Sequence, residues 1–177
     1  MQLTLPQHYI VKTQENISYY FFLNNDKEIC YQVFNENNFL AKNEILVKEI
    51  TVDFSVTINS SNEIHLICIT KVGNLLYYIG SDNGWHHKLL FKLDVRSNIY
   101  RYLLLFIENN YVHIFCVKTN LLNPIVSSIE HMYWNEKNFH RSTVASYLPG
   151  KYPSSYQVQI DQLNNIHIIY KVLYKNN

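Results

Sequence analysis

Three histidines recur at one place in a repeated phrase of the sequence. His65, His113 and His167 each stand second in a tetrapeptide whose other residues are apolar, namely IHLI, VHIF and IHII. Imidazole nitrogens are common zinc ligands, so three of them around one axis would suggest metal chemistry. Equivalent positions of stacked sheets lie on the order of 10 Å apart, however, whereas zinc takes its ligands at about 2 Å. We therefore predict no shared metal and expect each histidine to hydrogen-bond a turn or a neighbouring repeat.

Two other histidine pairs are candidates for metal binding. They are His86 with His87 and His131 with His140. Adjacent residues of a strand point to opposite faces, so His86 and His87 are poorly placed to share an ion. The sequence also has no Gly-rich phosphate loop, no Cys-x-x-Cys pair, no His-Glu-x-x-His and no Gly-x-Ser-x-Gly. We therefore predict neither a metal site nor a cofactor.

The three cysteines follow the repeat and not a metal-binding pattern. Cys68 and Cys116 each come four residues after the first residue of a repeated phrase, and Cys30 stands apart. An equivalent place in two repeats suggests a shared packing role, in which free cysteine behaves as a small apolar residue. We expect both to be reduced and buried between repeats.

The charge of the chain argues against two classes of partner. Fifteen basic and 14 acidic residues give a net charge of +1, and they are scattered along the sequence. No basic surface for nucleic acid is indicated. The N-terminus has no basic leader followed by an apolar stretch, and no apolar run is long enough to span a bilayer. We expect a cytoplasmic protein with no membrane insertion.

The repeated phrase predicts the architecture. It occurs four times, at intervals of 47, 48 and 54 residues, beginning at Ile17, Ile64, Val112 and Ile166. A period in the upper forties is typical of the blade of a β-propeller. The excess of aromatic and β-branched residues favours strands, and no segment has a helical period. We predict an all-β fold with blades of four antiparallel strands, about three and a half of them, which leaves the ring incomplete.

The predicted blades form a single partial propeller domain over residues 1–177. Their approximate limits are 7–48, 52–95, 100–147 and 154–177, the last one incomplete. The second strand of a blade is apolar on consecutive residues, as in Leu66-Ile67-Cys68-Ile69, which is typical of a strand covered on both faces. The fourth strand, such as Trp85–Lys92, mixes polar and apolar residues, as at a solvated rim.

A complete ring needs more blades than this chain provides. Six or seven blades take roughly 300 to 340 residues. The remaining blades would come from a longer chain or from self-association. The residues expected on the exposed end faces are Tyr19, Phe21, Phe22, Ile168, Ile169 and Tyr170.

One repeat resembles a blade of the Asp-box (sialidase-like) propellers and of the fucose-lectin-like propellers. The resemblance is carried by the stretch from Glu63 to Trp85, and above all by the turn Ser81-Asp82-Asn83-Gly84-Trp85. In an Asp-box, Ser, Asp, Gly and an aromatic residue fold the turn between the third and fourth strands. The resemblance implies that Ser81, Asp82 and Gly84 form a structural turn.

Likeness to the fucose-lectin-like propellers implies sugar pockets between blades. Each such pocket has an aromatic platform, with an arginine and a glutamate that bind sugar hydroxyls. On this basis Trp85 and Trp134 are candidate platforms, and Glu130 and Arg141 are candidate polar partners. The alternative is that each tryptophan packs on the neighbouring blade. The repeats share no Arg/Glu pair, so identical sites in every blade are not expected.

Likeness to sialidases implies an arginine cluster, a tyrosine nucleophile paired with a glutamate, and an aspartate acid/base. The sequence has only Arg96, Arg101 and Arg141, none in the Arg-Ile-Pro context of that family. We predict no catalytic residues.

The function predicted from the sequence is a non-catalytic propeller module that binds a protein or glycan partner. A protein partner is favoured by aromatic and polar segments expected in loops, such as His131-Met132-Tyr133-Trp134. A lectin-like glycan binder is the alternative, favoured by the Asp-box-like turn and Trp85. A fragment of a sialidase-like hydrolase is a third and weaker interpretation.

Overall fold

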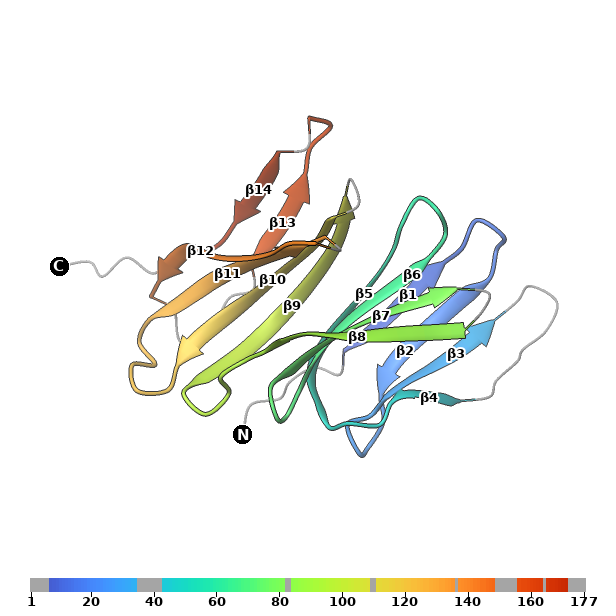
Figure 1. Cartoon of the computed structure of the whole chain (residues 1–177), viewed down its shortest axis with the longest axis horizontal. Helices are drawn as coiled ribbons and strands as arrows, with labels where there is room; N and C mark the ends of the chain where they lie inside the picture. The colour runs from blue at the N-terminus through green and yellow to red at the C-terminus, as the bar shows by residue number, and fades with distance from the viewer. Residues whose placement is uncertain are drawn as a thin grey trace.

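The computed structural model describes residues 7–34, 43–81, 84–108, 111–135, 137–148, 156–163 and 165–171. Throughout these ranges the chain forms strands and turns, without helices, as predicted. No segment of this part is therefore a helix long and apolar enough to cross a membrane. The described strands form three four-stranded sheets and one two-stranded sheet, which follow one another in an open arrangement (Figure 1).

All neighbouring strands within a sheet are antiparallel and follow chain order. The first sheet contains β1 (His8–Lys12), β2 (Ser18–Leu23), β3 (Ile29–Phe34) and β4 (Glu44–Val47). The second contains β5 (Thr51–Ile58), β6 (Ile64–Thr70), β7 (Asn74–Ser81) and β8 (Gly84–Lys92). The third contains β9 (Asn98–Glu108), β10 (Tyr111–Asn120), β11 (Ser127–Trp134) and β12 (Phe139–Tyr147). The fourth pairs β13 (Gln157–Ile160) with β14 (Ile166–Ile169).

The sheets stack face to face, and each junction buries an apolar cluster. The clusters include Phe21 and Leu66 at the first junction, Ile67 and Ile114 at the second, and Phe115 and Ile168 at the third. Burial of apolar surface at about 25 cal/mol per Å² is the main contribution that holds such sheets together. The first strands β1, β5 and β9 also contact one another in sequence, which sets the sheets side by side along one edge.

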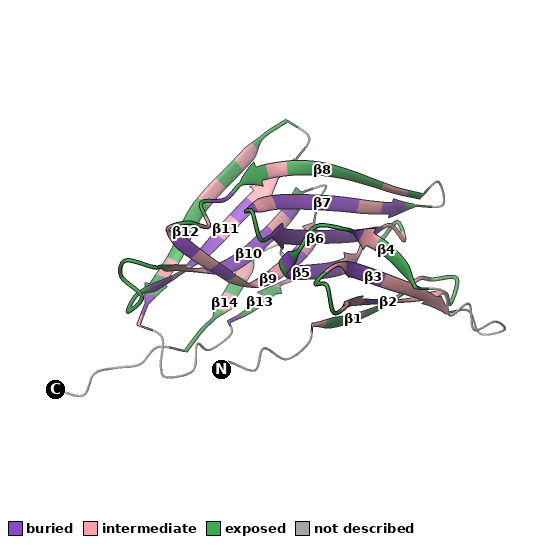
Figure 2. Cartoon of the chain, turned by 90° about the horizontal axis from the view of Figure 1, so that it is seen from below, coloured by how far each residue is buried: buried purple, intermediate pink, exposed green. Residues whose placement is uncertain are grey.

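In the second and third sheets burial falls from the inner strands to the outermost one, as the residue pattern predicted. Every residue of β6 is buried, which explains its run of consecutive apolar residues. β8, at the outer edge of the same sheet, has mostly exposed residues (Figure 2). The expectation for the cysteines is confirmed as well, because all three are free and buried. Cys68 and Cys116 lie in successive apolar clusters, and burial raises the pKa of both thiols to about 12.

A β-bulge at one place in three sheets marks the true register of the repeat. It falls between Ile29 and Cys30, between Leu75 and Leu76, and between Ile129 and Glu130. Bulges increase local twist and bend the strand, so a repeated one gives the three sheets the same shape.

The bulge corrects the alignment of the first repeat. When the repeats are aligned on this bulge, Cys30 corresponds to Leu76, and the next residues, Tyr31 and Tyr77, correspond as well. Their partners on the second strands, Phe21 and Ile67, therefore correspond too. Tyr19, and not Ser18, is then the equivalent of His65. The first interval is 46 residues instead of 47, because the consecutive apolar residues of β2 gave no alternation by which to fix the register.

Two expectations about exposure were wrong. The segment from His131 to Trp134 is not a loop but part of β11, and its Met132 is fully buried. Of the residues expected on the end faces, Phe21 is fully buried, and Tyr19 and Ile168 pack against the clusters. Ile169 and Tyr170 are exposed as expected, at 67% and 38%. Side chains alternate between the two faces of a sheet, so only every second residue of a terminal strand points to the exposed face. The expectation treated consecutive residues as equally exposed.

Candidate functional site

Glu130 and Arg141, named separately from the sequence, form an ion pair in the third sheet. Arg141 Nε donates a hydrogen bond of 3.0 Å to Glu130 Oε2. The other carboxylate oxygen accepts hydrogen bonds from Ser128 Oγ at 2.8 Å and Thr143 Oγ1 at 2.9 Å. The Glu130 side chain is 4% exposed and that of Arg141 is 26% exposed. The carboxylate is thus fixed and buried, while the guanidinium reaches solvent.

The pair is ionised at neutral pH. Burial opposes the charge of Glu130, but the hydrogen bonds from Ser128, Thr143 and Arg141 outweigh it and lower the pKa of this carboxyl group. Burial also opposes the charge of Arg141, and hydrogen bonds to Tyr100 and Glu130 outweigh it and raise the pKa of the guanidinium. The guanidinium, which reaches solvent, therefore offers a charged donor to a ligand, and the buried carboxylate holds it in place.

Glu130 stands where the other sheets carry apolar residues. It follows the repeated β-bulge, and the residues in the same place are Leu76 and Cys30. A buried ion pair is often no more stabilising than apolar residues of similar volume. A buried carboxylate in one repeat, at a place that is apolar in two others, is therefore better explained by a site than by stability.

The pair lines a groove between the second and third sheets, of about 560 Å³. The lining residues are Phe91, Lys92, Asp94, Asn98, Tyr100, Lys118, Glu130, Arg141, Ser142 and Thr143. The rings of Phe91 and Tyr100 each have their centre 5.9 Å from Arg141 Cζ. We call this the inter-sheet groove.

A buried amide adds a further polar group to the inter-sheet groove. Asn98 is 8% exposed, and its Nδ2 donates to the carbonyl of Asp94 at 3.1 Å. Its Oδ1 has no hydrogen-bond partner among the described residues. A buried acceptor without a partner is costly, which sets Asn98 apart from the other residues of the groove.

The two tryptophans lie outside the inter-sheet groove and pack between sheets, which was the alternative role considered for them. Trp85 makes edge contacts with Phe21 and Tyr31 of the first sheet, at 5.9 and 5.7 Å between ring centres. A Cβ on Gly80 would lie 2.8 Å from the Trp85 ring, so only glycine fits there. Trp134 contacts Tyr77 of the second sheet at 5.6 Å, with Lys88 Nζ 4.8 Å from its ring.

The turn proposed for Ser81, Asp82 and Gly84 is described only in part. Ser81 ends β7, Gly84 begins β8, and the two are paired. Gly84 has a φ of 102°, in the region that favours glycine. Asp82 lies outside the described residues, so its role stays a prediction.

The three repeat histidines hydrogen-bond different partners, in two cases within their own sheet. His65 Nδ1 bonds the Tyr77 hydroxyl, and His113 Nδ1 lies 3.1 Å from His131 Nε2. The expected bond to a turn is confirmed only for His167, whose Nε2 lies 2.9 Å from Asp161 Oδ2.

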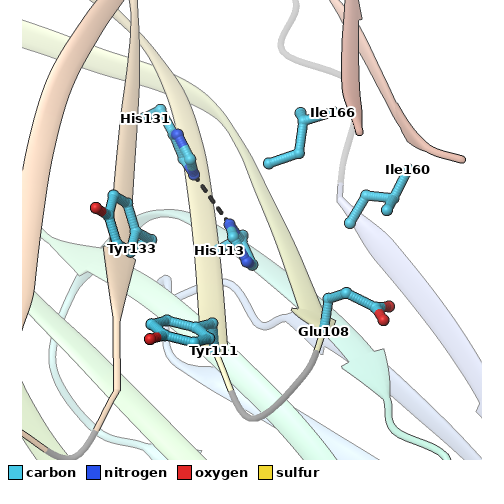
Figure 3. Close-up of a pocket in the computed structure, with 7 residues that line it drawn as sticks. All are labelled: Glu108, Tyr111, His113, His131, Tyr133, Ile160 and Ile166. Carbon is cyan, nitrogen blue, oxygen red and sulfur yellow. Dashed lines mark hydrogen bonds between the residues drawn. The ribbon is translucent and has the colours of Figure 1, made fainter. Parts of the chain in front are cut away.

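His113 and His131 line a second pocket, of about 290 Å³, between the third and fourth sheets. Glu108, Tyr111 and Tyr133 of the third sheet line it as well, and Ile160 and Ile166 of the fourth sheet form the facing wall (Figure 3). It includes Glu108 and Tyr111, at one end of β9 and β10, whereas the inter-sheet groove includes Asn98 and Lys118, near the other end. We call it the histidine pocket.

The sequence reading missed Phe91, Tyr100 and Asn98 as groove residues. Phe91 is an aromatic residue on a mostly exposed outer strand and is itself 37% exposed. An exposed aromatic residue at a solvated rim is the signal that would have drawn attention to it. Tyr100 and Asn98 carry no such signal, since they resemble ordinary strand residues.

Comparison with known proteins gives structural likeness only. No protein-family model matches the sequence, and no curated protein matches it. A solved structure of a bifunctional GH43-CE protein of Bacteroides eggerthii is 10% identical, with a TM-score of 0.52 over 81% of this chain and 20% of that one. At this identity the likeness concerns the fold alone.

Two further solved structures resemble the chain more weakly. A fucose lectin from Kordia zhangzhouensis, in complex with methyl-fucoside, has a TM-score of 0.49 at 11% identity, over 77% of this chain and 97% of that one. A mutant of AofleA from Arthrobotrys oligospora has a TM-score of 0.48 at 12% identity, over 77% and 42%.

Proposed function

We propose that this chain is a non-catalytic propeller module that binds a glycan in the inter-sheet groove. The observation that carries the proposal is the Glu130–Arg141 pair, whose carboxylate occupies an otherwise apolar place of the repeat and whose guanidinium lines a groove. The predicted blade limits, and the supply of further blades by a longer chain or by self-association, remain part of this proposal.

The groups of the groove suit a sugar. A sugar ring has hydroxyl groups around its edge and patches of C–H on its faces. Arg141 offers charged donors from a side chain that is 26% exposed, and the ring of Phe91 is 37% exposed. A few placed polar groups beside an aromatic surface are typical of small-ligand sites.

A glycan array that includes fucosides, probed with the full chain, tests the proposal. Hits are then measured by calorimetry on wild type and on Phe91→Leu, which removes the ring and keeps an apolar side chain. We expect at least about fivefold weaker binding, since a stacked aromatic contributes on the order of 1 kcal/mol or more. Tyr111→Leu is the matched control, because Tyr111 is also 37% exposed but lies at the histidine pocket.

Two results would contradict the proposal. One is an array without hits, and the other is equal binding by wild type and Phe91→Leu. A panel of fluorogenic glycosides checks the non-catalytic part, and we expect no turnover.

A protein partner is the second candidate, and the loop between β10 and β11 favours it. Leu121, Leu122, Ile125 and Val126 are 46%, 90%, 67% and 37% exposed. Clustered exposed apolar side chains mark interaction surfaces. Leu122→Lys would weaken a protein partner and leave glycan binding unchanged, whereas Phe91→Leu would do the reverse.

A further inference from the structure

The histidine pocket holds two imidazole nitrogens within hydrogen-bond distance of each other. His113 on β10 and His131 on β11 lie diagonally on neighbouring strands, and their side chains leave the same face of the third sheet (Figure 3). His113 Nδ1 and His131 Nε2 are 3.1 Å apart, with one proton shared between them as a hydrogen bond. The two nitrogens therefore face each other along this bond, with the ring centres 5.3 Å apart.

We propose that His113 Nδ1 and His131 Nε2 together bind a divalent transition-metal ion such as Zn²⁺ or Cu²⁺. Imidazole nitrogens bind these ions at about 2.0–2.1 Å, which places two ligands about 3.3 Å apart in tetrahedral geometry and about 2.9 Å apart at a right angle. The observed 3.1 Å lies between these values. Because the ring centres are 5.3 Å apart and the rings meet head-on along the hydrogen bond, each ring turns by roughly 40° to aim its nitrogen at an ion held at this distance.

Both histidines are already in the neutral form that binds metal. Burial lowers the pKa of His113, and the negative Glu108 opposes this only partly. Burial, with the neighbouring His113, lowers the pKa of His131 to about 4. At neutral pH the shared proton moves to the other nitrogen of its own ring when the metal binds, so no proton is released. The nitrogen lone pairs then both face the ion.

The rest of the coordination shell comes from solvent or ligand. Among the described residues no cluster of three His, Cys, Asp or Glu side chains surrounds a common point. The pocket of about 290 Å³ beside the two nitrogens leaves space for water molecules or for a small ligand on the ion. This differs from the site rejected on sequence grounds, which would have joined histidines of different repeats.

The second sheet provides a natural comparison. His65 corresponds to His113, and Tyr77 corresponds to His131. There the histidine bonds a phenol, and it is 4% exposed beneath the third sheet. The second sheet thus has one histidine and one tyrosine at these two positions, whereas the third sheet has two histidines.

This comparison supplies the test variant. His131→Tyr recreates the histidine–tyrosine pair of the second sheet, so it should preserve the fold. Calorimetric titration of the full chain with Zn²⁺, and separately with Ni²⁺, at neutral pH should give one ion per chain for wild type and at least about tenfold weaker binding for His131→Tyr. His86→Tyr is the control, because His86 lies on β8, in the second sheet, and should bind like wild type.

Circular dichroism checks that each variant is folded, and His113→Gln serves as a second variant if His131→Tyr is not. Equal affinity of wild type and a folded variant at position 113 or 131 would overturn the proposal. So would an equal loss in His86→Tyr, since binding would then involve exposed histidines in general.

Discussion

Asp53 on β5 accepts a hydrogen bond from the backbone N–H of Leu103 on β9, at 3.1 Å. The carboxylate is 4% exposed, and its other oxygen accepts a hydrogen bond from Gln7 Nε2. One buried side chain therefore joins the start of the first sheet, the second sheet and the third. Tyr102, next to Leu103, has a φ of 58°, in the left-handed region, where the pairing of β9 with β10 is irregular.

Replacement of this carboxylate should weaken the junction. In Asp53→Asn an amide NH₂ would face an N–H donor, because both carboxylate oxygens accept hydrogen bonds. We expect the free energy of unfolding to fall by about 1–3 kcal/mol, measured by urea denaturation. Asp26→Asn, in an exposed turn, should have little effect. An Asp53→Asn protein as stable as wild type would show that the junction does not depend on this charge.

The second prediction separates stability from function at Glu130 and Arg141. Glu130→Leu with Arg141→His installs the residues of the equivalent places in the second sheet, Leu76 and His87. We expect the double variant to be as stable as wild type or more so, but to lose glycan binding. Arg141→His alone should lower the free energy of unfolding by about 3–5 kcal/mol, because it leaves the buried carboxylate of Glu130 without the guanidinium that pairs with it. Thermal unfolding and calorimetry give the two readouts, and a double variant that still binds glycan would contradict the site.

Much of the fold could be predicted from the sequence because it rests on local patterns. Period, strand number and the buried second strands all follow from runs of apolar residues separated by polar turns. Prediction of the site, by contrast, would have required the register between neighbouring strands. Glu130 and Arg141 were named as candidates, but the pairing that joins them crosses a β-bulge for which the sequence has no signal. Strand register also decides which face of the sheet Trp85 and Trp134 lie on. It likewise decides the diagonal contact between His113 and His131.

The third prediction concerns stability at acid pH. Burial lowers the pKa of His131 to about 4, from about 6.5 in the unfolded chain, and burial lowers the pKa of His113 and His65 in the same direction. The folded state therefore binds fewer protons between these values, so the stabilisation is complete above pH 6.5 and is lost as the pH falls toward 4.

For His131 alone we expect a loss of about 1–2 kcal/mol over this range, after screening by solvent is allowed for. Urea denaturation at a series of pH values measures it. His131→Tyr should flatten the profile in part, since His113 and His65 remain. A wild-type profile that is flat between pH 6.5 and 4 would contradict the burial of these rings.

The fourth prediction concerns the end faces. Ile10 on β1 is 74% exposed and Ile169 on β14 is 67% exposed. Apolar surface of this kind favours association at about 25 cal/mol per Å² buried. We expect the 177-residue chain to self-associate at tens of micromolar, and a variant with Ile10→Lys and Ile169→Lys to be monomeric by light scattering. Ile125→Lys, in a loop and also 67% exposed, is the control. A monomeric wild-type chain at this concentration would show that the exposed apolar residues of the end faces do not drive association.

The central claim is that a glycan binds between the second and third sheets. Amide NMR of the labelled chain, titrated with the strongest glycan from the array, tests it most directly. We predict that the largest shift changes fall on Phe91, Lys92, Asn98 and Arg141 to Thr143, around the inter-sheet groove. Changes centred instead on Tyr111 to Tyr133 at the histidine pocket, or no changes with any glycan, would contradict the account.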